Sequence, residues 1–206
     1  MEMYENENDQ VDAIKRFFAE NGKALAVGVI LGVGALVGWR YWNNHQVDSA
    51  RGSSLQYENT VSAIQADRPE TLAAAEKFAA DNKNTYGALA SLEVAQQFVD
   101  KGELDKAAAQ LQQGLAAAGN DNLKALINLR LARIQVQQKK TDEALKTLDS
   151  VKGEGFASIV ADLRGEALLS KGDKQGARSA WEAGVKSNAS PALSEMMQMK
   201  INNLSV

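Results

Sequence analysis

Few residues of this 206-residue chain have the chemistry that an enzyme or a metal site requires. The single histidine, His45, has no evident base or nucleophile partner, and the chain contains no cysteine. The sequence has no spaced set of His, Asp and Glu ligands and no glycine loop of the kind that binds phosphate. It therefore predicts no catalytic residue, no metal ligand and no cofactor, and it favours a protein that binds other proteins over an enzyme.

The composition narrows the class of protein further. Without cysteine the chain cannot form disulfides and cannot be a bacterial lipoprotein, although it could still occupy an oxidising compartment. The net charge of −3 is no footprint for nucleic acid binding. The acids are concentrated at the start, because residues 1–23 hold six of the 26 acidic residues but only three of the 23 basic ones.

One apolar segment is long enough to cross a membrane. Residues 24–39 contain no charge, and the stretch to residue 42 has 19 residues. At about 1.5 Å per helical residue this spans roughly 28 Å, close to the ~30 Å hydrocarbon core of a bilayer. A basic residue at each end can extend to the lipid headgroups, and aromatic residues suit the interface. The predicted interface anchors are Lys23, Trp39, Arg40, Tyr41 and Trp42.

Two other interpretations of this segment are less favoured. A buried core helix would have a polar face, and residues 24–39 have none. A cleaved signal peptide would have a short basic start and a small-residue cleavage site. Here 23 acid-rich residues come first, and Trp-Arg-Tyr-Trp follows the apolar run. The sequence therefore predicts a transmembrane helix over residues 24–42.

The basic residues near the span indicate its orientation. Lys15, Arg16 and Lys23 precede it, whereas Arg40 and Arg51 follow it. Since the side richer in lysine and arginine stays in the cytoplasm, residues 1–23 are expected inside and residues 43–206 outside, in the periplasm of a Gram-negative cell. Within the cytoplasmic part we expect an acidic tail and a short amphipathic helix, formed by Val11, Ile14, Phe17 and Phe18.

The span also contains two glycine pairs of the G-x-x-x-G type. This spacing lets a second helix approach closely, although glycine is also common in membrane helices for other reasons. Both a partner helix and self-association stay open. The candidate packing residues are Gly28, Gly32, Gly34 and Gly38.

Residues 43–206 read as an all-α domain. Stretches of about 15 helix-forming residues alternate with breaks that contain glycine, asparagine or aspartate. Three of these breaks align, at residues 102–107, 139–144 and 172–177, and the alanines that end them are 37 and 33 residues apart. This is close to the tetratricopeptide period of about 34 residues, in which helical hairpins stack. The sequence predicts such hairpins, with a capping helix opened by Ser190 and Pro191.

Small and large residues recur at the positions where such hairpins pack. The match is incomplete, since Gln135 is polar, Ser91, Asn128 and Ala161 replace the usual tryptophan, and the closing proline is missing. An irregular array of helical hairpins therefore stays open. The predicted packing residues are Ala95, Phe98, Ala107, Leu111, Ala132, Ala144, Leu148, Gly165, Leu168, Ala177 and Trp181.

The first helices of the hairpins would line a groove for an apolar peptide or helix. The groove lacks the lysine and asparagine cluster of a clamp for a terminal carboxylate, and Met196, Met197 and Met199 suit either the core or a contact surface. The predicted groove residues are Leu89, Leu92, Gln96, Val99, Leu126, Leu129, Arg133, Val136, Ile159, Asp162, Glu166 and Leu169.

Two parts of the sequence resemble a known family. The N-terminal MEMYENENDQVDAIKRFFAENGKALAVGVILGVGALVGWRYW and the helical segments DNLKALINLRLARIQVQ and GARSAWEAGVKS are similar to the YfgM family of ancillary SecYEG translocon subunits. The resemblance implies an inner-membrane protein with a periplasmic tetratricopeptide-like domain.

The same resemblance implies a set of partners and a role. The partners are the SecYEG translocon, the membrane-anchored periplasmic chaperone PpiD, nascent secreted polypeptides and a cytoplasmic response regulator of envelope stress. The implied role is to pass exported polypeptides to periplasmic chaperones. A scaffold for cell-wall synthesis or division would use the same fold and topology, and so would a tethered regulator that acts through residues 1–23.

Overall fold

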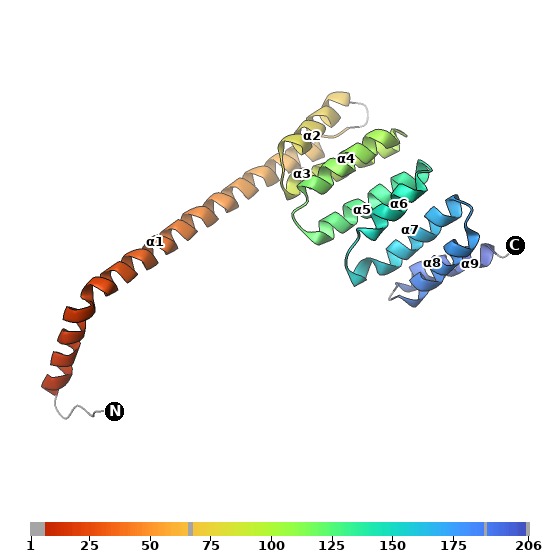
Figure 1. Ribbon diagram of the computed structural model, residues 1–206. Helices are drawn as coiled ribbons and strands as arrows, with labels where there is room; N and C mark the ends of the chain where they lie inside the picture. The colour runs from red at the N-terminus through yellow and green to blue at the C-terminus, as the bar shows by residue number, and fades with distance from the viewer. Residues whose placement is uncertain (1–6, 66–67, 188, 205–206) are drawn as a thin grey trace. The chain divides into compact units, whose positions relative to one another are not determined.

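The computed structural model describes residues 7–65, 68–187 and 189–204, and all regular structure in these residues is helical (Figure 1). This agrees with the all-α prediction. The predicted acidic tail lies partly outside the described residues, which begin at Glu7. The α-helices are α1 Glu7–Ser62, α2 Pro69–Asp81, α3 Thr85–Asp100, α4 Leu104–Ala117, α5 Asp121–Gln137, α6 Thr141–Asp149, α7 Ala157–Ser170, α8 Lys174–Lys186 and α9 Pro191–Asn203, with a 3-10 turn η1 at Glu154–Phe156.

The chain divides into two compact units, Met1–Gly52 and Ser53–Val206. The described part of the first unit is the N-terminal stretch of α1, which runs without a break through the predicted amphipathic segment and the predicted span. The last turns of α1 belong to the second unit. There Tyr57 packs its ring against Phe78 and Tyr86, so that these turns and α2 form the first pair of helices in the domain.

The apolar stretch of α1 is uncovered. Among the described residues, α1 is one helix long and apolar enough to cross a membrane, and no part of its most apolar window is buried within the chain. Large side chains such as Ile30 and Leu36 are about two-thirds exposed. A core helix of a water-soluble domain would bury such side chains, so the interpretation as a core helix is wrong for this segment.

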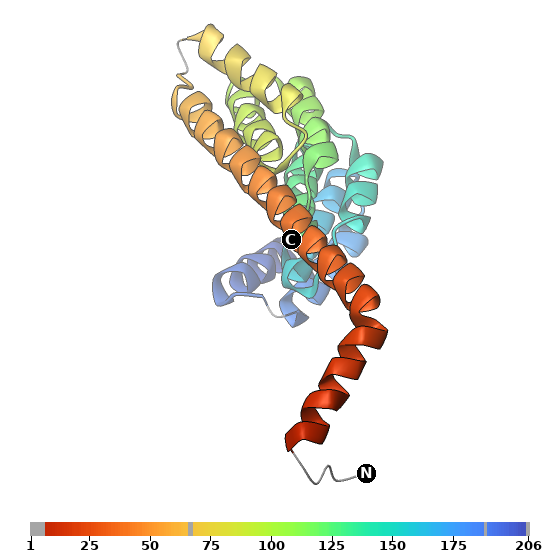
Figure 2. The same ribbon diagram turned by 90° about the vertical axis from the view of Figure 1, so that its left-hand side faces the viewer.

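Three helical hairpins make up most of the second unit (Figures 1 and 2). The helix α3 packs against α4, α5 against α6 and α7 against α8, and each hairpin contacts the next through α4 with α5 and α6 with α7. The helix α9 packs on α8 and covers the end of the stack. Ser190 caps α9, since its Oγ accepts a hydrogen bond from the Leu193 N–H at 3.3 Å, and Pro191 begins the helix, as predicted.

The three aligned breaks adopt one backbone conformation. Gly102, Lys139 and Gly172 all have positive φ, at 75°, 62° and 86°. In each turn the next N–H donates to the carbonyl five residues earlier, as in the bond of 2.8 Å from Lys140 to Gln135. This is the Schellman motif, which ends a helix at a left-handed residue. Because Lys139 adopts it without being glycine, the alignment of the three turns is structural as well as numerical.

The hairpins pack closely where small residues face large ones. Most of the predicted packing residues are buried, whereas Leu168 is partly exposed. The tightest contact joins α7 and α8, because a Cβ added at Gly165 would lie 2.3 Å from the indole nitrogen of Trp181. The polar Gln135 is also buried, and it accepts a hydrogen bond of 2.8 Å from the Thr147 hydroxyl on the partner helix.

Candidate functional site

The predicted groove residues divide by exposure into two rows and a buried set. On each first helix, one apolar residue near the start and one near the end are partly or fully exposed. We call them the first apolar row, which is Leu89, Leu126 and Ile159, and the second apolar row, which is Val99, Val136 and Leu169. Between these rows each helix places one polar residue, namely Gln96, Arg133 and Glu166.

Three of the predicted groove residues are buried. Leu92, Leu129 and Asp162 are 4%, 7% and 5% exposed, and they occupy the same position in successive hairpins. Leu92 and Leu129 belong to the hydrophobic core of their repeats, and only Leu92 reaches the floor of a cleft. The prediction that Leu129 and Asp162 line an open groove is wrong, because this position faces the neighbouring helices rather than solvent.

A cleft opens between α3 and α5, with α4 at its base. Its volume is about 240 Å³. We call it the arginine cleft, and it is lined by Leu92, Ala95, Gln96, Val99, Leu111, Arg130, Arg133, Ile134 and Gln137. Four of these residues belong to the predicted groove.

The arginine cleft contains two positive charges and no acidic lining residue. Arg130 and Arg133 are both exposed, and among the described residues neither forms an ion pair. Gln96 donates a hydrogen bond of 2.8 Å to Asp100, which lies outside the lining. Sequence analysis did not select Arg130. The signal was its spacing of three residues from Arg133, which puts both side chains on one face of α5.

A second cleft, of about 520 Å³, lies where α9 covers α7 and α8. We call it the capping cleft, and it is lined by Glu166, Leu169, Lys174, Trp181, Lys200, Asn203 and Leu204. Lys200 lies 2.7 Å from a carboxylate oxygen of Asp162 and 2.7 Å from one of Glu166. The indole N–H of Trp181 donates to the backbone carbonyl of Asp162 at 3.1 Å.

The ionisation of Lys200 reflects these contacts. Burial lowers the pKa of this lysine, but the hydrogen bonds and charges of Asp162 and Glu166 outweigh burial, so that the pKa is raised above its ordinary value. The ammonium group therefore stays protonated and neutralises a carboxylate that is almost fully buried. Sequence analysis missed this lysine, since 38 residues separate it from Asp162.

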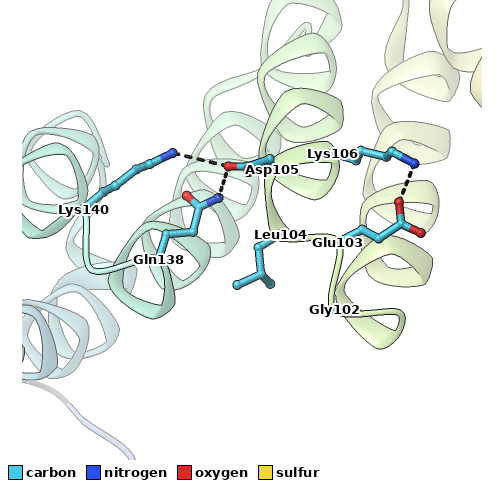
Figure 3. Close-up of a pocket in the computed structure, with 7 residues that line it drawn as sticks. All are labelled: Gly102, Glu103, Leu104, Asp105, Lys106, Gln138 and Lys140. Carbon is cyan, nitrogen blue, oxygen red and sulfur yellow. Dashed lines mark hydrogen bonds and ion pairs between the residues drawn. The ribbon is translucent and has the colours of Figure 1, made fainter.

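A third cleft, of about 590 Å³, lies between the turns of the first two hairpins (Figure 3). Its charged residues are paired with one another. Asp105 accepts a hydrogen bond of 2.8 Å from Gln138 and lies 3.4 Å from Lys140, while Lys106 pairs with Glu103. These contacts link adjacent hairpins at the surface, and they leave no unpaired charge among the charged residues that line the cleft.

The residues with membrane chemistry all lie on α1. Lys23, Trp39, Arg40, Tyr41 and Trp42 are exposed, and the rings of Trp39 and Trp42 lie 5.6 Å apart. A Cβ added at any of the four predicted packing glycines would meet no other atom within 4 Å. His45 is also exposed on this helix, and the described residues contain no group of three or more His, Cys, Asp or Glu side chains that could hold a metal ion.

Comparison with known proteins places these features in a family. Residues 15–206 match the model of the tetratricopeptide repeat-like domain. The chain is 79% identical over 206 residues to the ancillary SecYEG translocon subunit of Escherichia coli strain K12, and the match covers all of both chains. It is 36% identical over 199 residues to the subunit of the same description from Haemophilus influenzae, which covers 96% of this chain and 97% of the relative. The match to the one from Neisseria gonorrhoeae is 24% identical over 202 residues.

Proposed function

The chain belongs to the family of ancillary SecYEG translocon subunits, and we propose on this basis that it is a non-enzymatic accessory subunit that links exported polypeptides to periplasmic chaperones. The observation that carries the proposal is the uncovered apolar stretch of α1 joined to a stack of helical hairpins. The first element suits anchorage beside a membrane channel, and the second suits peptide binding.

The anchor contributes to binding through effective concentration. A domain held at the membrane beside the channel meets the emerging polypeptide as an intramolecular partner, so that weak contacts suffice. We propose that α1 supplies the association with the translocon, and that the hairpin face supplies reversible contacts with exported chains or with a chaperone such as PpiD. The exposed glycines of α1 offer a surface where another membrane helix can approach closely.

Affinity isolation of the intact protein in mild detergent, with partners identified by mass spectrometry, tests this role. Recovery of the translocon together with a membrane-anchored chaperone supports the proposal. Recovery of cell-wall or division machinery in place of the translocon contradicts it and favours the scaffold interpretation.

The glycine surface can be tested in the same isolation. We expect Gly28→Leu with Gly32→Leu to reduce recovery of the translocon, because the larger side chains keep a partner helix away. The matched control is Ala26→Leu with Val33→Leu, which changes the other side of the helix at about 100° per residue. Equal recovery with both variants contradicts a packing role for the first glycine pair.

The proposed topology places residues 1–23 in the cytoplasm and the hairpin domain in the periplasm. The chain has no cysteine, so a single introduced cysteine gives an unambiguous label. In cells with a permeabilised outer membrane, we expect a membrane-impermeant maleimide to label Glu154→Cys but not Glu20→Cys. The reverse pattern contradicts the orientation on which the periplasmic role depends.

A further inference from the structure

The arginine cleft has a charge that the fold itself does not use. Arg130 and Arg133 are three residues apart on α5, so their side chains are neighbours on the helix surface. Two like charges at this spacing repel each other and destabilise the helix. Among the described residues no carboxylate pairs with either guanidinium, and no acidic residue lines the cleft. The pair is therefore complementary to an anionic group from outside the domain.

The size and lining of the cleft indicate what kind of group fits it. Its volume of about 240 Å³ is below the roughly 300–1,000 Å³ that is usual for small-molecule sites. Leu92, Val99 and Leu111 make a large part of its surface apolar. A space of this size suits one or two side chains of a polypeptide that crosses the surface, rather than an enclosed small ligand.

The surroundings along α5 continue the apolar character on both sides of the charges. Leu126, Arg130, Arg133 and Val136 follow one another at intervals of four, three and three residues, which places them along one stripe of the helix. Leu126 is exposed and Val136 is partly exposed. A bound segment can therefore continue over an apolar residue in either direction from the arginines.

We propose that the arginine cleft binds an internal polypeptide segment in which an acidic side chain lies between apolar residues. The carboxylate pairs with Arg130 and Arg133, whose planar guanidinium groups can donate two parallel hydrogen bonds to a carboxylate. The apolar neighbours of the acid contact Leu126, Val136 and the cleft floor at Leu92. This inference rests on the proposed function, since it names the class of polypeptide that the hairpin face recognises.

An internal acid fits better than a terminal carboxylate because apolar surface extends on both sides of the arginines. A chain end would occupy only one side. Nucleic acid is a poorer match, since two arginines on a chain of net charge −3 neutralise few phosphates.

Fluorescence anisotropy with the full-length protein in phospholipid nanodiscs tests the proposal. The probes are three labelled peptides of leucine, valine, alanine and serine. The first has blocked ends and a central glutamate, the second has glutamine at that position, and the third has glutamine and a free carboxyl terminus. Empty nanodiscs measure partition of the peptides into lipid.

We expect the glutamate peptide to bind at least tenfold more tightly than the blocked glutamine peptide at low ionic strength, with a smaller ratio at higher salt. Arg130→Gln with Arg133→Gln should reduce this ratio below twofold. The matched control is Lys152→Gln with Lys186→Gln, which removes two exposed positive charges outside the cleft and should keep the ratio. Arg130→Lys with Arg133→Lys should give an intermediate ratio, because charge stays but the planar fork is lost.

Three results would overturn the inference: equal binding of the glutamate and blocked glutamine peptides, an unchanged ratio in the arginine-to-glutamine variant, or tightest binding of the peptide with the free terminus. The proposed function fails separately. If the arginine variant still recovers the translocon while the wild-type protein does not discriminate between the peptides, only the assignment of the acidic segment is wrong.

Discussion

The arginine cleft and the capping cleft present equivalent positions of the repeat in two different states. Arg133 and Glu166 lie 33 residues apart and occupy the same place on α5 and α7. In the capping cleft, Lys200 of α9 lies 2.7 Å from Glu166 and also neutralises the buried Asp162. In the arginine cleft, no described residue neutralises Arg133 or its neighbour Arg130.

The difference shows how one repeat position can serve either stability or recognition. Where the capping helix covers the stack, it brings the opposite charge and the site becomes part of the folded core. Where no later element covers the surface, the charge stays open to a partner. Substitutions in the capping cleft should therefore change stability, whereas substitutions in the arginine cleft should change binding.

The largest expected effect comes from the aromatic residue in the capping cleft. Trp181 is 1% exposed, and its ring packs against Gly165 and beneath Lys200. Trp181→Ala should lower the free energy of unfolding by about 3–5 kcal/mol, because it leaves a large cavity between α7 and α8. Urea unfolding of the full-length protein in detergent, followed by circular dichroism, measures the change.

Trp39→Ala is the control for this prediction, because Trp39 is exposed on α1. It should leave the urea midpoint of the helical domain unchanged. A change below about 1 kcal/mol for Trp181→Ala would mean that the capping cleft does not stabilise the stack.

The next effect in size comes from the ion pairs of the capping cleft. Lys200→Met should destabilise the domain by about 1–2 kcal/mol, because the nearly buried Asp162 loses its partner. This is less than the 3–5 kcal/mol of a fully buried pair, since one quarter of the lysine side chain is exposed and solvent screens its charge. Lys186→Met, on the exposed side of α8, should have no measurable effect. Equal stability of the two variants in thermal unfolding would remove the contrast between the clefts.

A pH series sharpens this prediction. The pKa of Lys200 is raised in the folded protein, so its stabilising contribution is complete below the pKa of an unfolded lysine, about 10.4. The contribution is lost as the pH rises through the folded pKa. We expect the stability difference between wild-type protein and Lys200→Met to be constant from pH 7 to 9 and to shrink above about pH 10.4. A difference that shrinks toward acidic pH within that range would contradict the assignment to Lys200.

The smallest effect on stability is expected in the arginine cleft. Arg130→Gln with Arg133→Gln should change the free energy of unfolding by no more than about 0.5 kcal/mol, because both side chains are exposed and unpaired. Relief of the repulsion between them makes a small increase the expected sign. Urea unfolding of this variant beside Lys200→Met compares the clefts directly, and a loss above about 1.5 kcal/mol would mean that the arginines are structural.

Several features of the fold followed from the sequence because they depend on local periodicity. The aligned turns were visible in the alanine spacing, and all three end a helix at a left-handed residue. The cap of α9 was visible in the pair Ser190 and Pro191. These features involve residues within a few positions of one another, so the chemistry that forms them is present in a short segment.

The binding face was predicted less completely, for reasons that lie between helices. Periodicity identified one face of each first helix, but it could not separate the buried Leu129 from the exposed Leu126 on that face. The position of Leu129 is decided by where the next hairpin packs. Arg130 was missed because a charged residue beside a buried one looks like an ordinary solvated position until the cleft is seen.

The sequence by itself determined the uncharged run of residues 24–39 and the spacing of the hairpins, since backbone hydrogen bonding and helical periodicity act within each segment. Only the tertiary structure decided which charges are paired. Asp162 and Lys200 are 38 residues apart, and they meet because α9 packs across the last hairpin. The stacking of the helices thus neutralises one position of the repeat and leaves its equivalent at Arg133 unpaired, because an ion pair forms only where the packing brings opposite charges within a few ångströms.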